Sequence, residues 1–204
     1  TDAKFYYSGG LSTSPDGNNA ITTIELPDTV STIGEYAFYD CVNLQTLKLP
    51  SSLVEIKEGL FFLCEKLTAV TLPAGLSAIG VQAFYRCKAL TEMQIPQGVT
   101  EIGREAFYDC SSLQSVKIPQ SVNTLGESLF YNCVNLSSVD MSGLNTTSLP
   151  DYMFRNCKAL ESVTVPEGVQ SLGTGCFQSA GLTSFRLPDS VKDVSGYLFD
   201  GCAS

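Results

Sequence analysis

The sequence predicts a right-handed solenoid of about eight stacked coils, and three residue columns with a common period carry this prediction. Proline recurs every 23 residues at positions 27, 50, 73, 96 and 119. Phenylalanine repeats in step at 38, 61, 84, 107, 130, 154, 177 and 199, and cysteine follows it at 41, 64, 87, 110, 133, 157 and 202. A fixed period of this length indicates small units that bury their apolar sides only by stacking on one another.

Each coil is expected to contain one short strand that ends before the proline position. From Leu44 to Leu49 the sequence ends in alternating apolar and polar residues, as in a strand with one buried face. Proline stops such a strand because it has no backbone N–H to donate to the ladder. Stacked coils therefore predict a parallel sheet with one strand from each coil.

The segment 34–41 is expected to form one or two turns of helix. Its spacing places Ala37, Phe38 and Cys41 on one inward side. The first position of this segment is usually glycine, but in one coil it is Pro150, which cannot adopt a positive φ. A φ near −65° fits the first residue of a short helix, so we interpret this position as a helix start.

The cysteines are expected to form a ladder of buried free thiols rather than disulfides or a metal site. Residues 23 apart lie above one another with Cβ atoms about 4.8 Å apart, the spacing of parallel strands. A disulfide prefers about 3.8 Å between its Cβ atoms. A metal needs thiolates that converge on one point. Cys176 occupies the position before a core phenylalanine and should also face inward.

The pattern divides the chain into an N-terminal cap or irregular segment, residues 1–20, and a repeat domain, residues 21–204. Between Cys133 and Cys157 the repeat gains one residue and lacks the strand-ending proline, so a bulge is expected there. The next coil is one residue short near Ala180, which should change the curvature. No C-terminal cap is recognisable before residue 204, and an open end would allow end-to-end association.

Composition argues against several classes of function. The formal net charge of −9 repels nucleic acid and anionic lipid, and no apolar run is long enough to span a membrane. Histidine is absent, which removes the commonest general base and the usual zinc ligand. We expect no enzyme, no metal and no cofactor; paired carboxylates such as Glu101 and Glu105 are the remaining catalytic alternative.

Segments such as Leu72-Pro73-Ala-Gly-Leu-Ser-Ala-Ile79-Gly80-Val-Gln-Ala83-Phe84-Tyr-Arg-Cys87 resemble the BspA-like family of leucine-rich repeats. The resemblance extends from about residue 21 to residue 202. It implies a curved solenoid with a parallel β-sheet on the concave side and short helical or irregular turns on the convex side. It also implies a surface or secreted protein of a host-associated bacterium or parasitic protist, often with a role in adhesion or host-protein binding.

Two columns of outward side chains are candidate binding surfaces. The first, which we call the polar face, follows the expected strands: Glu25, Lys48, Thr71, Gln94, Lys117, Asp140, Thr164 and Arg186. The second, the aromatic stripe, follows the core phenylalanines: Tyr39, Phe62, Tyr85, Tyr108 and Tyr131. The polar face suits a protein or glycan ligand but is also what a solvated sheet surface looks like. Tyrosine is common at recognition surfaces, yet stacked rings also stabilise a solenoid, and the structural interpretation of the stripe is favoured.

The sequence therefore predicts a non-enzymatic binding module located outside the cell or on a bacterial surface. Its expected partner is a protein, such as a host extracellular protein, or a glycan. A passive spacer within a larger surface protein is the alternative function. The ligand and the oligomeric state stay open at this point.

Overall fold

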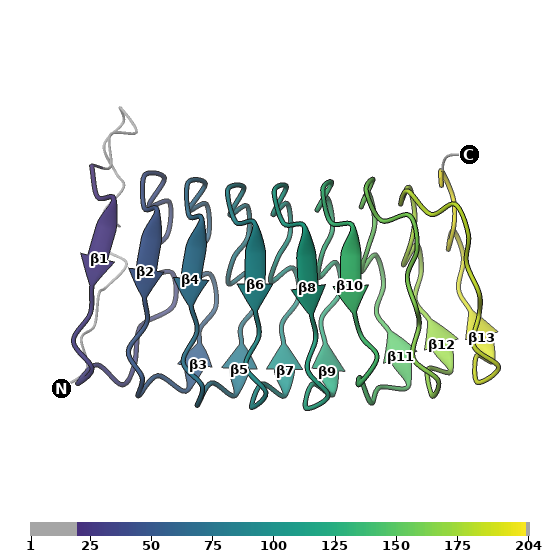
Figure 1. The fold of residues 1–204 in the computed structure, drawn as a ribbon, viewed down its shortest axis with the longest axis horizontal. Coiled ribbons are helices and arrows are strands. Elements are labelled where there is room, and N and C mark those ends of the chain that lie inside the picture. Colours follow the sequence, from purple (N-terminus) through teal and green to yellow (C-terminus); the bar gives the residue numbers. More distant parts are fainter. Residues whose placement is uncertain (1–19, 203–204) are drawn as a thin grey trace.

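The computed structural model describes residues 20–202, which form a single row of stacked coils (Figure 1). Each coil contributes strands of two or three residues, and every strand pair is parallel. The predicted repeat solenoid and its parallel sheet are confirmed. Neighbouring coils are joined by backbone hydrogen bonds along three separate lines, which we call the first strand ladder, the second strand ladder and the turn ladder.

The first strand ladder contains the strands predicted from the sequence, and their outward side chains build the polar face. Its strands are β1 (Thr23–Glu25), β2 (Thr46–Lys48), β4 (Ala69–Thr71), β6 (Glu92–Gln94), β8 (Ser115–Lys117) and β10 (Ser138–Asp140). The middle residue of each strand points inward and the residues on either side point outward. The ladder divides into the sheets β1-β2-β4 and β6-β8-β10, because β4 and β6 do not pair.

The second strand ladder was not predicted. It consists of two-residue strands on a different side of each coil: β3 (Glu55–Ile56), β5 (Ala78–Ile79), β7 (Glu101–Ile102), β9 (Thr124–Leu125), β11 (Ser148–Leu149), β12 (Ser171–Leu172) and β13 (Asp193–Val194). Two residues are too few to show a period in the sequence. This ladder divides between β9 and β11.

The break between β9 and β11 lies where the sequence gains its extra residue. There Thr146 makes local hydrogen bonds with Ser148: the hydroxyl donates to the Ser148 carbonyl, 3.1 Å away, and accepts from its amide, 3.4 Å away. These local bonds stand in place of the pairing with β9. The irregularity expected in this coil is thus an interruption of the second strand ladder.

The turn ladder corrects the helix predicted for residues 34–41, because this segment forms irregular turns. Tyr36 and Asp40 adopt left-handed φ values of 53° and 55°, which a right-handed helix does not allow. The backbone amides of Tyr36, Phe38 and Asp40 point out of the coil and donate to the next coil's carbonyls at 2.9, 3.0 and 2.7 Å. Hydrogen bonds between coils therefore replace those within a helix. The start of a helix proposed at Pro150 is wrong for the same reason.

The core contains columns of identical side chains, above all the phenylalanines and the cysteines, that stack on one another from coil to coil. Successive phenylalanine rings lie 5.1 to 5.7 Å apart from Phe38 to Phe177. The predicted ladder of free thiols is confirmed: seven cysteines, Cys176 included, are buried, and Cys202 is half-buried. The thiol of Cys87 donates a hydrogen bond to the carbonyl oxygen of Phe61, 3.2 Å away, and its counterparts do the same. Burial raises the pKa of the Cys87 thiol well above its usual value.

The recurring glycine permits a close approach between coils. A Cβ atom on Gly103 would lie 2.5 Å from the Val81 nitrogen, and one on Gly126 would lie 2.1 Å from the Arg104 nitrogen. Neither glycine has a positive φ, in agreement with the proline that takes this position elsewhere. Space, and not backbone conformation, selects glycine here.

The last two coils lack first-ladder strands. Residues 163–165 and their counterparts in the following coil form no strand, while β11, β12 and β13 continue to pair. Val194, Tyr197 and Phe199 of the last coil are exposed. The N-terminal cap predicted for residues 1–20 lies almost wholly outside the described residues.

Candidate functional site

The polar face is assembled in two groups, and the structure does not unite all eight of its residues in one sheet. Glu25, Lys48 and Thr71 lie directly opposite one another in β1, β2 and β4. Gln94, Lys117 and Asp140 do the same in β6, β8 and β10. Thr164 and Arg186 lie beyond the strands but continue the column and remain exposed.

Hydrogen bonds and an ion pair hold the Asp140 carboxylate of the polar face in place. Its carboxylate accepts hydrogen bonds from the hydroxyl and the backbone amide of Ser142, 2.7 and 3.0 Å away, and forms an ion pair with Lys117 at 3.1 Å. These interactions, with the Ser142 hydroxyl first, lower the pKa of Asp140 to about 2. The carboxylate is therefore charged at any physiological pH.

Small hollows occur toward the two ends of the polar face. One of about 310 Å³ is lined by Glu25 and Lys48 beside the apolar side chains of Ile24, Leu26 and Leu49. Another of about 200 Å³ lies beside Thr164 and Arg186, where the first ladder is absent. Both are shallow, and the face between them presents mostly hydroxyl and amide groups. Such a surface can offer many hydrogen bonds to a large ligand but cannot enclose a small one.

The aromatic stripe is a continuous stack whose ring faces are covered by neighbouring rings. The rings of Phe62 and Tyr85 lie 4.5 Å apart with an angle of 3°, and those of Tyr85, Tyr108 and Tyr131 follow at 4.7 Å. Arg155 covers the last face, with its guanidinium 5.3 Å from the centre of the Tyr131 ring. From Phe62 to Tyr131 both faces of each ring are covered in this way, so a sugar could not stack on this part of the stripe.

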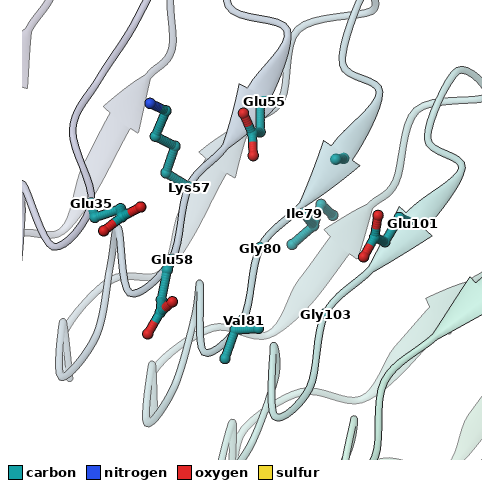
Figure 2. Close-up of a pocket in the computed structure, with 10 residues that line it drawn as sticks. Glu35, Glu55, Lys57, Glu58, Ile79, Gly80, Val81, Glu101 and Gly103 are labelled. Atoms are coloured by element: carbon teal, nitrogen blue, oxygen red, sulfur yellow. The ribbon is translucent and has the colours of Figure 1, made fainter.

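The second strand ladder carries a cavity that the sequence analysis missed. About 320 Å³ in volume, it is lined by four carboxylates and one amine around the short stretch 78–81, and Figure 2 shows these side chains: Glu35, Glu55, Glu58, Glu101 and Lys57. Ala78, Gly80 and Gly103 leave it open because they are small. Aligning the coils in columns could have revealed the acidic residues, but the strand that brings them together leaves no pattern in the sequence.

The two carboxylates considered for catalysis, Glu101 and Glu105, lie in different parts of the coil. Glu101 lines the acidic cavity, whereas Glu105 lies on the turn side. There its carboxylate accepts a hydrogen bond from Gln82 at 2.6 Å and pairs with Arg104 at 2.8 Å. Within residues 20–202, no three Asp, Glu or Cys side chains are placed to hold a metal ion. In the same range, no helix is long and apolar enough to cross a membrane.

The fold and its surfaces define a class of protein: a parallel β-solenoid of short repeats with an exposed sheet face. The profile of the BspA type leucine-rich repeat region matches six copies within residues 16–105 and 77–204. The chain belongs to this family. The resemblance inferred from the spacing of proline, phenylalanine and cysteine is therefore confirmed.

Solved structures of bacterial proteins share the fold. A leucine-rich repeat protein from Bacteroides ovatus is 33% identical, with a TM-score of 0.85 over 95% of this chain and 56% of its own length. This chain thus spans only a little over half of that protein. A leucine-rich repeat protein of T. pallidum is 34% identical, with a TM-score of 0.72 over 82% of this chain and 78% of that one.

A leucine-rich cell surface protein from Faecalibacterium prausnitzii is 23% identical, with a TM-score of 0.52 over 89% of this chain and 77% of its own. At this identity the likeness concerns the fold alone. A comparison with curated proteins finds no significant match.

Proposed function

We propose that this chain is a protein-binding module that works at a bacterial cell surface or outside the cell, through the polar face. The observation that carries this proposal is the row of outward side chains on strands β1, β2, β4, β6, β8 and β10, which the other residues of the range 20–202 leave largely exposed. A partner can lie across several coils at once and make hydrogen bonds to each. The location is supported by membership of the BspA type leucine-rich repeat family.

A protein partner is favoured over a glycan by the chemistry of the polar face. Sugars bind well where aromatic ring faces are free, and the polar face has no aromatic side chain in any of its eight positions. Closely spaced charges of both signs, such as Lys117 and Asp140, suit the mixed charges of a protein surface. Binding, and not catalysis, is the role that this arrangement of side chains serves best.

The test is a binding screen of the chain against immobilised extracellular matrix proteins and glycans. A bulky side chain on the polar face, Ser115→Arg in β8, should abolish binding of the partner found. The matched control is Thr124→Arg in β9, which makes a similar exposed change on the second strand ladder. Reversal of charge by Lys117→Glu or Arg186→Glu should weaken the same complex by about tenfold.

Two outcomes would overturn the proposal. Binding lost equally in the Ser115→Arg and Thr124→Arg variants would place the site elsewhere or indicate misfolding. A chain that binds no protein or glycan under any condition would instead support the passive spacer.

A further inference from the structure

The aromatic stripe contains three tyrosines in successive coils, and their phenol rings lie face to face. The ring centres of Tyr85 and Tyr108 are 4.7 Å apart with an angle of 9°, and those of Tyr108 and Tyr131 are 4.7 Å apart with an angle of 11°. Phe62 covers one end of this tyrosine stack, and the guanidinium of Arg155 covers the other. Each phenol in the stack therefore has another phenol as its immediate neighbour.

The tyrosine stack is accessible from solution and is not held by hydrogen bonds. Its three side chains are only partly buried. Within residues 20–202, no group forms a hydrogen bond with the hydroxyl of Tyr85, Tyr108 or Tyr131. Burial raises the pKa of Tyr85 and of Tyr108, so both phenols keep their protons at neutral pH. The chain has no tryptophan, and tyrosine is therefore its most readily oxidised aromatic residue.

Stacked phenols are arranged as the coupling of two phenoxyl radicals requires. When a phenol loses an electron and its hydroxyl proton, the unpaired electron spreads over the oxygen and the ring carbons ortho and para to it. The orbital that holds this electron projects from the two faces of the ring, so a bond forms most directly between rings that face each other. The backbone ladders hold neighbouring coils in register, which favours coupling within one chain over coupling between chains.

We propose that the tyrosine stack is a site of oxidative modification, where a peroxidase and hydrogen peroxide join Tyr108 to Tyr85 or to Tyr131 by a carbon–carbon bond. Each of the two phenols gives up one electron and one proton, and hydrogen peroxide takes up both electrons and both protons to form two molecules of water. The two radicals couple at carbons ortho to their oxygens. The hydrogen on each of these carbons then shifts to the oxygen, which restores two phenols.

The product is a covalent link between two neighbouring coils. It joins positions that are 23 residues apart in the sequence, as Tyr85 and Tyr108 are. Such a link restricts the unfolded chain in the way that a disulfide does. The cross-linked protein should therefore need more urea to unfold than the untreated protein. At a surface exposed to peroxide, the modification would strengthen the solenoid without changing the polar face.

The test is to treat the dilute chain with a peroxidase and hydrogen peroxide and to locate the cross-link by mass spectrometry. Trypsin cleaves after lysine and arginine and so places Tyr85 and Tyr108 in the separate peptides 67–86 and 105–117. We expect peptide 105–117 to be joined to a neighbouring tyrosine peptide with the loss of two hydrogen atoms. The treated chain should show the blue fluorescence of a biphenol and still migrate as a monomer in a denaturing gel.

Tyr108→Phe is the decisive variant, because it removes a phenol from both stacked pairs and keeps the ring. It should lower the yield of cross-link within the chain by about tenfold or more, since Tyr85 and Tyr131 are no longer adjacent phenols. The matched control is Tyr197→Phe, which removes a tyrosine that is 70% exposed in the last coil and should leave the yield unchanged. An equal yield in the Tyr108→Phe variant would overturn the proposal, as would a wild-type chain that forms no cross-link or forms it only between chains.

Discussion

At the scale of single residues, the stacked phenylalanines show how position in the solenoid decides what a side chain contributes. Phe107 is completely buried, with the rings of Phe84 and Phe130 at 5.4 and 5.6 Å on either side. Phe199, in the last coil, stacks on Phe177 at 6.1 Å and is 39% exposed. The same residue type therefore has very different surroundings.

This difference predicts that replacing phenylalanine by alanine lowers the stability more in the middle of the stack than at its end. Phe107→Ala should lower the free energy of unfolding by about 3–5 kcal/mol, since it leaves a cavity between two rings that the backbone ladders hold apart. Phe199→Ala should cost less than half as much, because its ring already contacts water on one side. Urea denaturation measures both. Equal losses would mean that the stack is not closed at Phe107 as described.

The thiol ladder ties the stability of the fold to alkaline pH. Burial raises the pKa of Cys87, Cys110 and Cys133 above the value in the unfolded chain, near 8.5. The folded state therefore holds these protons more tightly. Stability is unaffected below that pH and falls as the pH rises above it, while the unfolded thiols ionise.

We expect the free energy of unfolding to decrease steeply above about pH 9, by up to about 1.4 kcal/mol per pH unit for each buried thiol. Cys110→Ala should reduce this slope by one thiol's share, whatever its effect on stability at neutral pH. Urea denaturation from pH 7 to 10.5 gives the slope. If the slope is the same in both proteins, the Cys110 thiol is not buried in protonated form.

At the scale of the element, the sequence predicted which residues face inward but not how the backbone turns between them. Phe38 and Cys41 face the core as their spacing indicates. That spacing suits a helix as well as a turn, and the left-handed residues that decide the matter include Tyr36 and Leu63, which have no preference for that conformation. Hydrogen bonds to the next coil impose it, and the sequence of one coil does not show them.

The candidate binding surfaces, like the fold, could be predicted only in part from the sequence. The polar face and the aromatic stripe follow from the period, because each position lies directly above its counterpart in the neighbouring coil. The interruption between β4 and β6 leaves the period intact and so leaves no trace in the sequence. The acidic cavity depends on the second strand ladder and was missed with it.

The glycine that permits close approach of two coils leads to a second prediction, in which glycine-to-alanine substitutions at two positions change the stability by unequal amounts. A Cβ on Gly126 would meet backbone atoms at 2.1 and 2.4 Å, so Gly126→Ala should push two coils apart and cost about 1–3 kcal/mol or more. A Cβ on Gly75 would have no atom within 4 Å. Gly75→Ala should be neutral or stabilise by about 0.4–1 kcal/mol, since it restricts the unfolded chain. Thermal denaturation of the two variants checks this, and a neutral Gly126→Ala would contradict the close packing.

At the scale of the whole molecule, the turn ladder is the part that joins every coil to the next. It continues from Tyr36 to Ser179 with three hydrogen bonds at each junction. The first strand ladder is interrupted between β4 and β6 and absent after β10, and the second is interrupted between β9 and β11. The interruptions fall at different junctions, so at least one strand ladder always accompanies the turn ladder.

This arrangement predicts that amide hydrogen exchange differs more within one coil than between coils. In the coil of Phe177, the amides of Gly175, Phe177 and Ser179 donate to the next coil at 2.7 to 3.2 Å and should exchange near the rate of global unfolding. The segment 163–165 of the same coil has no backbone hydrogen bonds to either neighbour and should exchange within seconds to minutes.

Hydrogen exchange followed by mass spectrometry on peptides that cover the two segments makes the comparison. The corresponding strand β8, paired on both sides with β6 and β10, serves as the control and should be protected. Protection of 163–165 equal to that of β8 would contradict the loss of the first ladder in the later coils. If the amides of the turn segment exchanged before those of the strands, the strand ladders would be what holds the solenoid together. A ligand bound to the polar face would then raise the free energy of unfolding of the whole stack, because it binds to those strands.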